Sequence, residues 1–146
     1  FAVLQSSIHE AWARNWCSTH ETRLRYAISD LLFTFPFPEI HSELIKVGEC
    51  YHDYRKSIML KYDEGLTKIY NRVHDINEIS QDVIRIRELQ KDMDYAVWRS
   101  YGFEAIDFAH EFYETKQGIR YSISPTAISS ILSNLLILNN KLANDM

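Results

Sequence analysis

Apolar residues recur every three or four positions over long parts of the chain, the spacing that places side chains on one face of an α-helix. The longest such stretch covers residues 40–62 and is rich in aromatic side chains. Similar spacing over residues 2–18, 80–101 and 125–142 predicts three more helices. The pattern therefore favours helices packed against helices.

Local signals mark the expected ends of these helices. Gly65 and Gly102 follow the second and third helical stretches, and glycine commonly ends a helix. Ser80 and Asp82 are the two candidate N-caps for the third stretch. Ser124 and Pro125 open the last one, which is typical of an N-cap followed by proline at the first helical position.

Two short stretches alternate between apolar and polar residues, as strands do. One lies near 23–28, and the other surrounds Lys116-Gln117-Gly118 and predicts a hairpin near 112–123. Together these patterns predict a mainly α protein. We expect a bundle of about four longer helices with a small β element attached.

Residues 33–38 contain two prolines within a run of aromatic residues. Such a run can neither continue a helix nor pair fully in a sheet, so we expect an extended, buried connector. It places a boundary between residues 1–38 and 39–146. After the long second helix, residues 66–75 are interpreted as a short polar loop.

Composition and charge exclude several classes of protein. The chain has 146 residues, 46 % of them hydrophobic, and no apolar run long enough to span a bilayer. Its net charge of −4 argues against a histone-like or strongly basic nucleic-acid binder. Because the chain begins at Phe1 in sequence that already reads as folded, we expect it to be a piece of a longer protein.

Catalytic and metal-binding motifs are missing from the sequence. Cys17 and Cys50 lie far apart, so we expect reduced, buried thiols of a cytoplasmic protein rather than a zinc or redox site. Residues 110–114 resemble a zinc-protease helix without its second histidine, and we interpret them as a surface patch. The adjacent pair His74-Asp75 points in two directions and makes a poor dyad. We therefore expect a non-catalytic chain.

Two clusters carry side chains of the types that contact phosphates and base edges in DNA. The candidate DNA-binding residues are Lys68, Tyr70, Asn71 and Arg72 in the predicted loop, and Lys116, Gln117 and Arg120 on the predicted hairpin. The alternative is that both clusters are solvated polar surface. The aromatic residues on the helical stripes are expected to fill the core, with base stacking as the alternative if they are exposed; they are Tyr51, Tyr54, Tyr62 and Trp98.

Several stretches resemble, in order, sequences of MmeI-like type IIL restriction–modification enzymes and related DNA adenine methyltransferases. The stretches are 2–14 (AVLQSSIHEAWAR), 24–26 with 29–30, 33–38 (FTFPFP), 65–75 (GLTKIYNRVHD), 114–118 (ETKQG) and 135–139 (LLILN). They cover nearly the whole chain and are specific together, although each is weak alone. Where relatives commonly have Gly-His-Gly, this chain has Ala109-His110-Glu111, so no role is carried over to His110.

The resemblance implies a place at the C-terminal end of such an enzyme. Residues 1–38 would end the target-recognition domain, and residues 39–146 would form a C-terminal helical domain. The parent would transfer a methyl group from S-adenosylmethionine to adenine N6 in double-stranded DNA, and many relatives also carry a nuclease domain. The S-adenosylmethionine site would lie upstream, so the resemblance assigns no catalytic or cofactor residue to this chain.

Two functions follow as alternatives. The chain could be a non-catalytic module that helps hold double-stranded DNA beside the methyltransferase and recognition domains. It could instead be a structural buttress, or a subunit-interaction domain, that does not touch DNA. In either case the cysteines and the absence of a long apolar run lead us to expect a cytoplasmic protein with no membrane partner.

Overall fold

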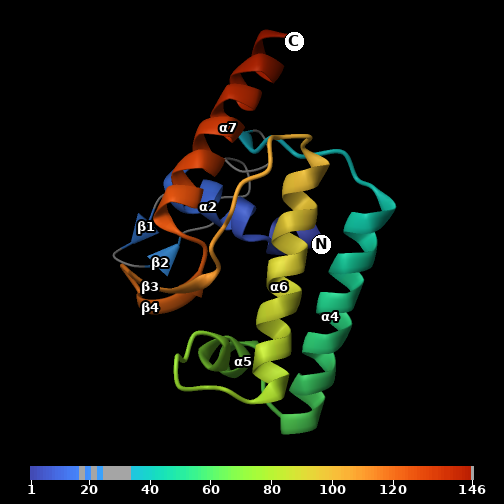
Figure 1. Ribbon diagram of the computed structural model, residues 1–146, viewed down its shortest axis with the longest axis vertical. Helices are drawn as coiled ribbons and strands as arrows, with labels where there is room; N and C mark the ends of the chain where they lie inside the picture. The colour runs from blue at the N-terminus through green and yellow to red at the C-terminus, as the bar shows by residue number, and fades with distance from the viewer. Residues whose placement is uncertain (17–18, 21–22, 25–33, 146) are drawn as a thin grey trace.

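The computed structural model describes residues 1–16, 19–20, 23–24 and 34–145, and within them it is mainly helical with two small antiparallel sheets (Figure 1). The elements in chain order are α1 (Ala2–Gln5), α2 (Ser7–Trp16), β1 (Thr19–His20), β2 (Arg23–Leu24), α4 (Ser42–Tyr62), α5 (Leu66–Val73), α6 (Gln81–Ser100), β3 (Glu111–Thr115), β4 (Gly118–Ser122) and α7 (Pro125–Asn144). The predicted fold class, a mainly α protein with a small β element, is confirmed.

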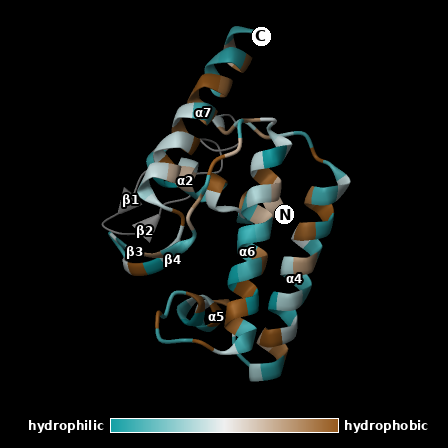
Figure 2. Ribbon diagram, in the orientation of Figure 1, coloured by the Kyte–Doolittle hydropathy of each residue, from teal (hydrophilic) through white to brown (hydrophobic). Residues whose placement is uncertain are grey.

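Helices α4 and α6 lie side by side and run in opposite directions along one side of the molecule (Figure 1). Leu44, Tyr51 and Ile58 recur every seven residues on α4 and are buried. Figure 2 shows hydrophobic and hydrophilic residues interspersed along both helices, as one buried and one exposed face require. Tyr51 and Trp98 are buried, which confirms the core expectation for these two, whereas it is wrong for Tyr62, which is exposed.

Residues from both sides of the predicted boundary share one hydrophobic core. Trp12 of α2 and Phe35 of the connector belong to the same buried cluster as Trp98 of α6 and Ile131 of α7. Phe35 packs edge-on against Trp12, with ring centroids 6.1 Å apart. Helix α2 is therefore packed against the helices that follow the connector, and the domain boundary itself stays a prediction.

The hairpin and the last helix form where their local signals predict them. Strands β3 and β4 pair so that Thr115 lies opposite Gly118, which leaves a two-residue turn. Gly118 has a φ of 101°, a conformation that favours glycine. Ser124 caps α7, accepting a hydrogen bond from the Ala127 amide at 3.0 Å. The predicted strand near 23–28 is present at β2, and its other residues lie outside the described part of the chain.

The interpretation of residues 66–75 as a loop is wrong, because most of them form helix α5. The helix buries only Ile69 and Val73, four residues apart, between Gly65 before it and His74 after it. A buried stripe of two residues is a weak sequence signal. It is nevertheless enough to hold this short amphipathic helix against α6.

The cysteine prediction is wrong where the structure tests it. Cys50 is exposed on α4 rather than buried, while Cys17 lies outside the described residues. None of the helices in the described part of the chain is both long enough and apolar enough to cross a membrane.

Candidate nucleic-acid interface

A pocket of about 390 Å³ opens between helix α2, the end of helix α5 and the β3–β4 hairpin. Three of the predicted DNA-binding residues line it: Lys116, Gln117 and Arg120. Arg14 of α2 and His74 at the end of α5 also line the pocket, which we call the hairpin groove. The groove thus brings together residues that lie more than a hundred positions apart in the sequence.

The charges around the hairpin groove are mostly positive. Arg14 pairs with Glu10 on its own helix, at 2.9 Å between Nε and Oε1. Lys116 is exposed and Arg120 is half-buried, and no carboxylate among the described residues forms an ion pair with either. The groove therefore offers two uncompensated cations and a third that shares its charge with Glu10. Such a set suits the singly charged phosphates of a nucleic-acid backbone.

His74 carries a defined hydrogen bond to the hairpin. Its Nδ1 accepts the backbone N–H of Tyr121 at 3.1 Å, which satisfies an amide on the outer edge of β4. The pKa of His74 is lowered to about 4, mainly by burial and also by Arg120, Arg87 and Arg14, which repel the imidazolium. The ring is consequently neutral near pH 7.

Acidification should destabilise the fold through His74. The unfolded chain gains this proton near the ordinary pKa of 6.5, whereas the folded chain gains it only near about 4. Stability is therefore lost as the pH falls through that window, by about 1 kcal/mol after allowance for solvent exposure. Urea unfolding at pH 7 and pH 4.5 should show a smaller loss for His74→Asn than for the unsubstituted chain. An equal loss for the two proteins would contradict the assignment.

The other predicted DNA-binding residues lie on helix α5, where some face solvent and others contact the rest of the protein. Lys68 and Asn71 are exposed and remain available to a ligand. Tyr70 turns inward, where its hydroxyl accepts hydrogen bonds from Gln5 Nε2 at 2.8 Å and Arg55 Nη1 at 2.6 Å. The structure thus gives Tyr70 a role in joining α5 to α1 and α4.

Arg72 is committed to two carboxylates. It makes a two-pronged contact with Glu64, at 2.8 and 2.7 Å, and lies 3.6 Å from Glu78. Its hydrogen bonds to Glu64 hold the pKa of that carboxyl below the ordinary value. The guanidinium also lies over the Tyr62 ring, 4.9 Å from its centroid. The structure therefore places Arg72 away from the hairpin groove, within a local ion-pair network.

This arrangement predicts opposite results for two neighbouring cations. Arg72→Gln should lower the melting temperature, because it breaks a two-pronged ion pair, and should leave DNA affinity nearly unchanged. Lys68→Gln should leave stability unchanged within about 0.5 kcal/mol. Thermal unfolding and DNA titration of both variants check this. A larger affinity loss for Arg72→Gln than for Lys68→Gln would contradict the assignment.

Arg87 of α6 fastens the end of α5 against the hairpin. Its guanidinium donates to four backbone carbonyls, those of Arg72, Val73, Asp75 and Glu78. It also lies over the rings of Phe112 and Tyr121, with centroid distances of 4.9 and 5.7 Å. These contacts fix His74 relative to the strand that it faces.

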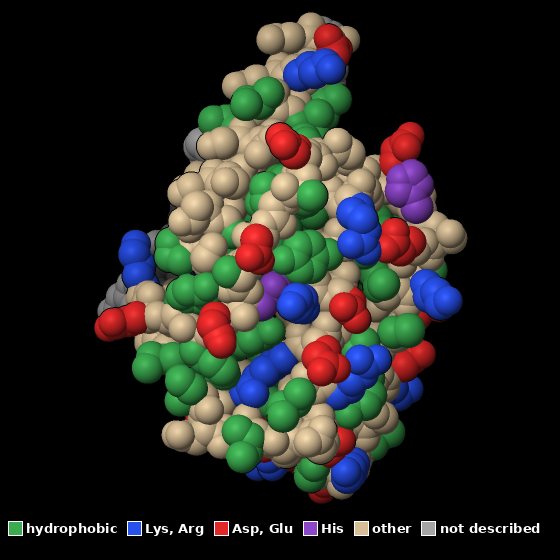
Figure 3. All heavy atoms as spheres, in the orientation of Figure 1, with side chains coloured by type: hydrophobic (Ala, Val, Ile, Leu, Met, Phe, Trp, Pro, Cys, Tyr) green, Lys and Arg blue, Asp and Glu red, His purple; other side chains and the backbone are tan. Residues whose placement is uncertain are grey.

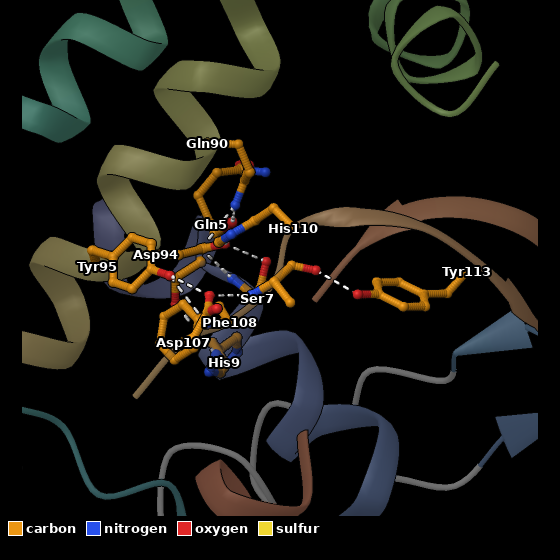
Figure 4. A network of polar contacts seen from close by, with 12 residues as sticks. Gln5, Ser7, His9, Gln90, Asp94, Tyr95, Asp107, Phe108, His110 and Tyr113 are labelled. Carbon is orange, nitrogen blue, oxygen red and sulfur yellow. Dashed lines mark hydrogen bonds and ion pairs between the residues drawn. The ribbon is translucent and has the colours of Figure 1, made fainter. Parts of the chain in front are cut away.

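A buried carboxylate holds the other two walls of the groove together (Figure 4). Asp94 of α6 is fully buried and accepts from the Ser7 backbone N–H at 2.7 Å and the Ser7 hydroxyl at 2.6 Å. It also accepts from Gln90 at 3.0 Å and contacts His110 Nε2 at 2.7 Å. Because Ser7 begins α2 and His110 immediately precedes β3, Asp94 sets the position of α2 relative to the hairpin.

The same residues do not form a hydrolytic triad. In such a triad the serine hydroxyl donates to the histidine, which in turn donates to the carboxylate. Here Ser7 and His110 both contact Asp94 directly, and the side chains of Asp94 and His110 are buried. The arrangement is suited to holding elements together.

The prediction of a surface patch at residues 110–114 is wrong for His110, whose side chain is 2 % exposed. Glu111 starts strand β3, so the helical spacing that a zinc-protease motif needs is absent. Within the described residues, no group of three or more His, Cys, Asp or Glu side chains could hold a metal ion.

Sequence reasoning missed four residues that shape the interface: Arg14, His74 as a groove residue, Asp94 and His110. Arg14 lies within the stretch 2–14 that carried the resemblance, but nothing local links it to the hairpin. The contacts of Asp94 span 87 positions to Ser7 and 16 to His110, so no periodicity could indicate them.

The face of the molecule drawn in Figure 3 has no large field of one sign, because acidic and basic side chains are interspersed over it. The concentration of positive charge at the hairpin groove is therefore local, and it is compatible with a net charge of −4. Comparisons with family models, with curated proteins and with solved structures found no significant match for this chain.

Proposed function

We propose that this chain is a non-catalytic DNA-binding module whose hairpin groove holds phosphate groups of double-stranded DNA. The observation that carries the proposal is the meeting of Arg14, Lys116 and Arg120 around one groove of about 390 Å³. Phosphate contacts of this kind position a protein on DNA without reading its sequence. Gln117 in the groove, and Lys68 and Asn71 on α5, are proposed as further contacts.

The resemblance to MmeI-like enzymes supplies the context of the proposal. In that context the module would assist target recognition by a DNA adenine-N6 methyltransferase or restriction–modification protein in the cytoplasm. Its partners would be double-stranded DNA and the upstream methyltransferase and recognition domains. S-adenosylmethionine would be held by the upstream methyltransferase domain.

A salt titration tests the proposal. Fluorescence anisotropy with a labelled duplex should show binding that weakens about 40-fold between 50 and 200 mM KCl, the effect of about three phosphate contacts. The same titration with an uncharged labelled fluorophore is the control. Absence of binding at 50 mM KCl would contradict the proposal.

The alternative proposal is a structural buttress without DNA contact. The shared core favours it, because Trp12 before the predicted boundary and Trp98 after it belong to one buried cluster. The helical part would then serve to support the recognition domain. In that case, removing residues 39–146 from the parent should lower its melting temperature while leaving specific DNA binding intact in the cold.

A further inference from the structure

The two ring nitrogens of His74 have different environments. Nδ1 accepts the Tyr121 amide at 3.1 Å. Since an amide N–H can only donate, Nδ1 carries no proton. The neutral ring must therefore carry its proton on Nε2, and the low pKa of His74 keeps the ring in this form near pH 7.

The Nε2–H group has no hydrogen-bond partner among the described residues. The His74 side chain is half-buried, and among the described residues Nε2 is not one of the buried nitrogens that lack a hydrogen-bond partner. The Nε2–H group is therefore accessible to solvent. His74 itself lines the hairpin groove, together with Arg14, Lys116 and Arg120. An unpaired donor among cations is complementary to an anionic oxygen.

We propose that His74 contacts DNA directly, donating its Nε2–H to a phosphate oxygen held in the hairpin groove. This inference rests on the proposed DNA-binding function. Nδ1 and Nε2 then divide two tasks: the first holds the edge of β4, and the second binds the ligand. A neutral donor releases no counterion, so its contribution differs in kind from that of the lysine and arginines.

Two substitutions separate the tasks. His74→Asn keeps an acceptor near the position of Nδ1 and removes the Nε2 donor. His74→Gln reaches the position of Nε2 with an amide N–H and loses the acceptor for Tyr121. We therefore expect His74→Asn to weaken binding with little loss of stability. His74→Gln should retain more of the affinity and melt at a lower temperature.

The experiment is an anisotropy titration of the unsubstituted chain and both variants at pH 7.5, from 50 to 200 mM KCl, with duplexes of two sequences. We expect His74→Asn to bind about fivefold more weakly at every salt concentration, with an unchanged salt slope and an equal loss on both duplexes. Nitrogen-15 spectra of the imidazole should show the Nε2–H tautomer. These results together would support the contact.

Other outcomes overturn the inference in distinguishable ways. If the unsubstituted chain binds and His74→Asn binds equally well, the His74 contact is wrong while the proposed function stands. A loss on only one duplex would indicate contact with a base edge and overturn the phosphate assignment. An Nδ1–H tautomer would remove the structural basis. If the unsubstituted chain does not bind DNA at all, the proposed function and the His74 contact both fail.

Discussion

Replacing Asp94 by alanine is expected to lower the free energy of unfolding by about 3–5 kcal/mol, because several hydrogen-bond donors would lose the buried carboxylate that they share. The carboxylate is fully buried, and the Ser7 amide and hydroxyl, the Gln90 amide and the His110 ring all depend on it as an acceptor. These donors would lose their shared acceptor at a position where the carboxylate itself is fully buried. Urea unfolding followed by far-ultraviolet circular dichroism measures this loss.

The matched control for Asp94→Ala is Asp92→Ala, on the same helix but exposed to solvent. This control should change stability by less than about 0.5 kcal/mol. A loss below about 1 kcal/mol for Asp94→Ala would show that the buried network does not hold the fold together. Asp94→Ala should also weaken DNA binding, because α2 and the hairpin would lose their common anchor.

Neutralising the hairpin should have the largest effect on DNA binding. The double variant Lys116→Gln/Arg120→Gln removes the two groove cations that have no ion-pair partner among the described residues. The slope of the logarithm of its binding constant against the logarithm of salt concentration should decrease in magnitude by about 2. Its affinity at 50 mM KCl should fall by about 10- to 100-fold. Anisotropy titrations over the same salt range as for the unsubstituted chain give both quantities.

A control variant with the same change in net charge separates the effect of the groove cations from the effect of net charge. Lys46→Gln/Lys56→Gln changes the net charge by the same amount on exposed positions of α4, which Figure 1 places on the opposite side of the molecule from the hairpin. It should reduce affinity by less than about threefold. Equal losses for the two double variants would mean that net charge, rather than the groove, governs binding.

Features with local signals were predictable from the sequence. Ser124 and Pro125 fix the start of α7, and Gly118 fits the turn of the hairpin, because each residue acts on its own backbone. Helix α5 was missed because its buried stripe has only two residues, Ile69 and Val73. A helix of this length is stabilised mainly by its packing against α6, and the local helix propensity of its residues does not reveal it.

The candidate site could be predicted only in part. Lys116, Gln117 and Arg120 were recognisable because they cluster on one hairpin, and the structure places all three in the groove. Arg72 has the same chemistry in the sequence, but its charge is taken up by Glu64. Which cations are free depends on tertiary neighbours, and a linear sequence does not contain that information.

The most direct test of the DNA-binding account is amide chemical-shift mapping of the chain titrated with a short duplex at low salt. The account predicts that the largest shifts fall on α2, on His74 and on the β3–β4 hairpin around Lys116 and Arg120. The exposed face of α4 should change little. Shifts concentrated on α4 or α7, or no shifts with duplex in excess, would contradict the account and favour the structural alternative.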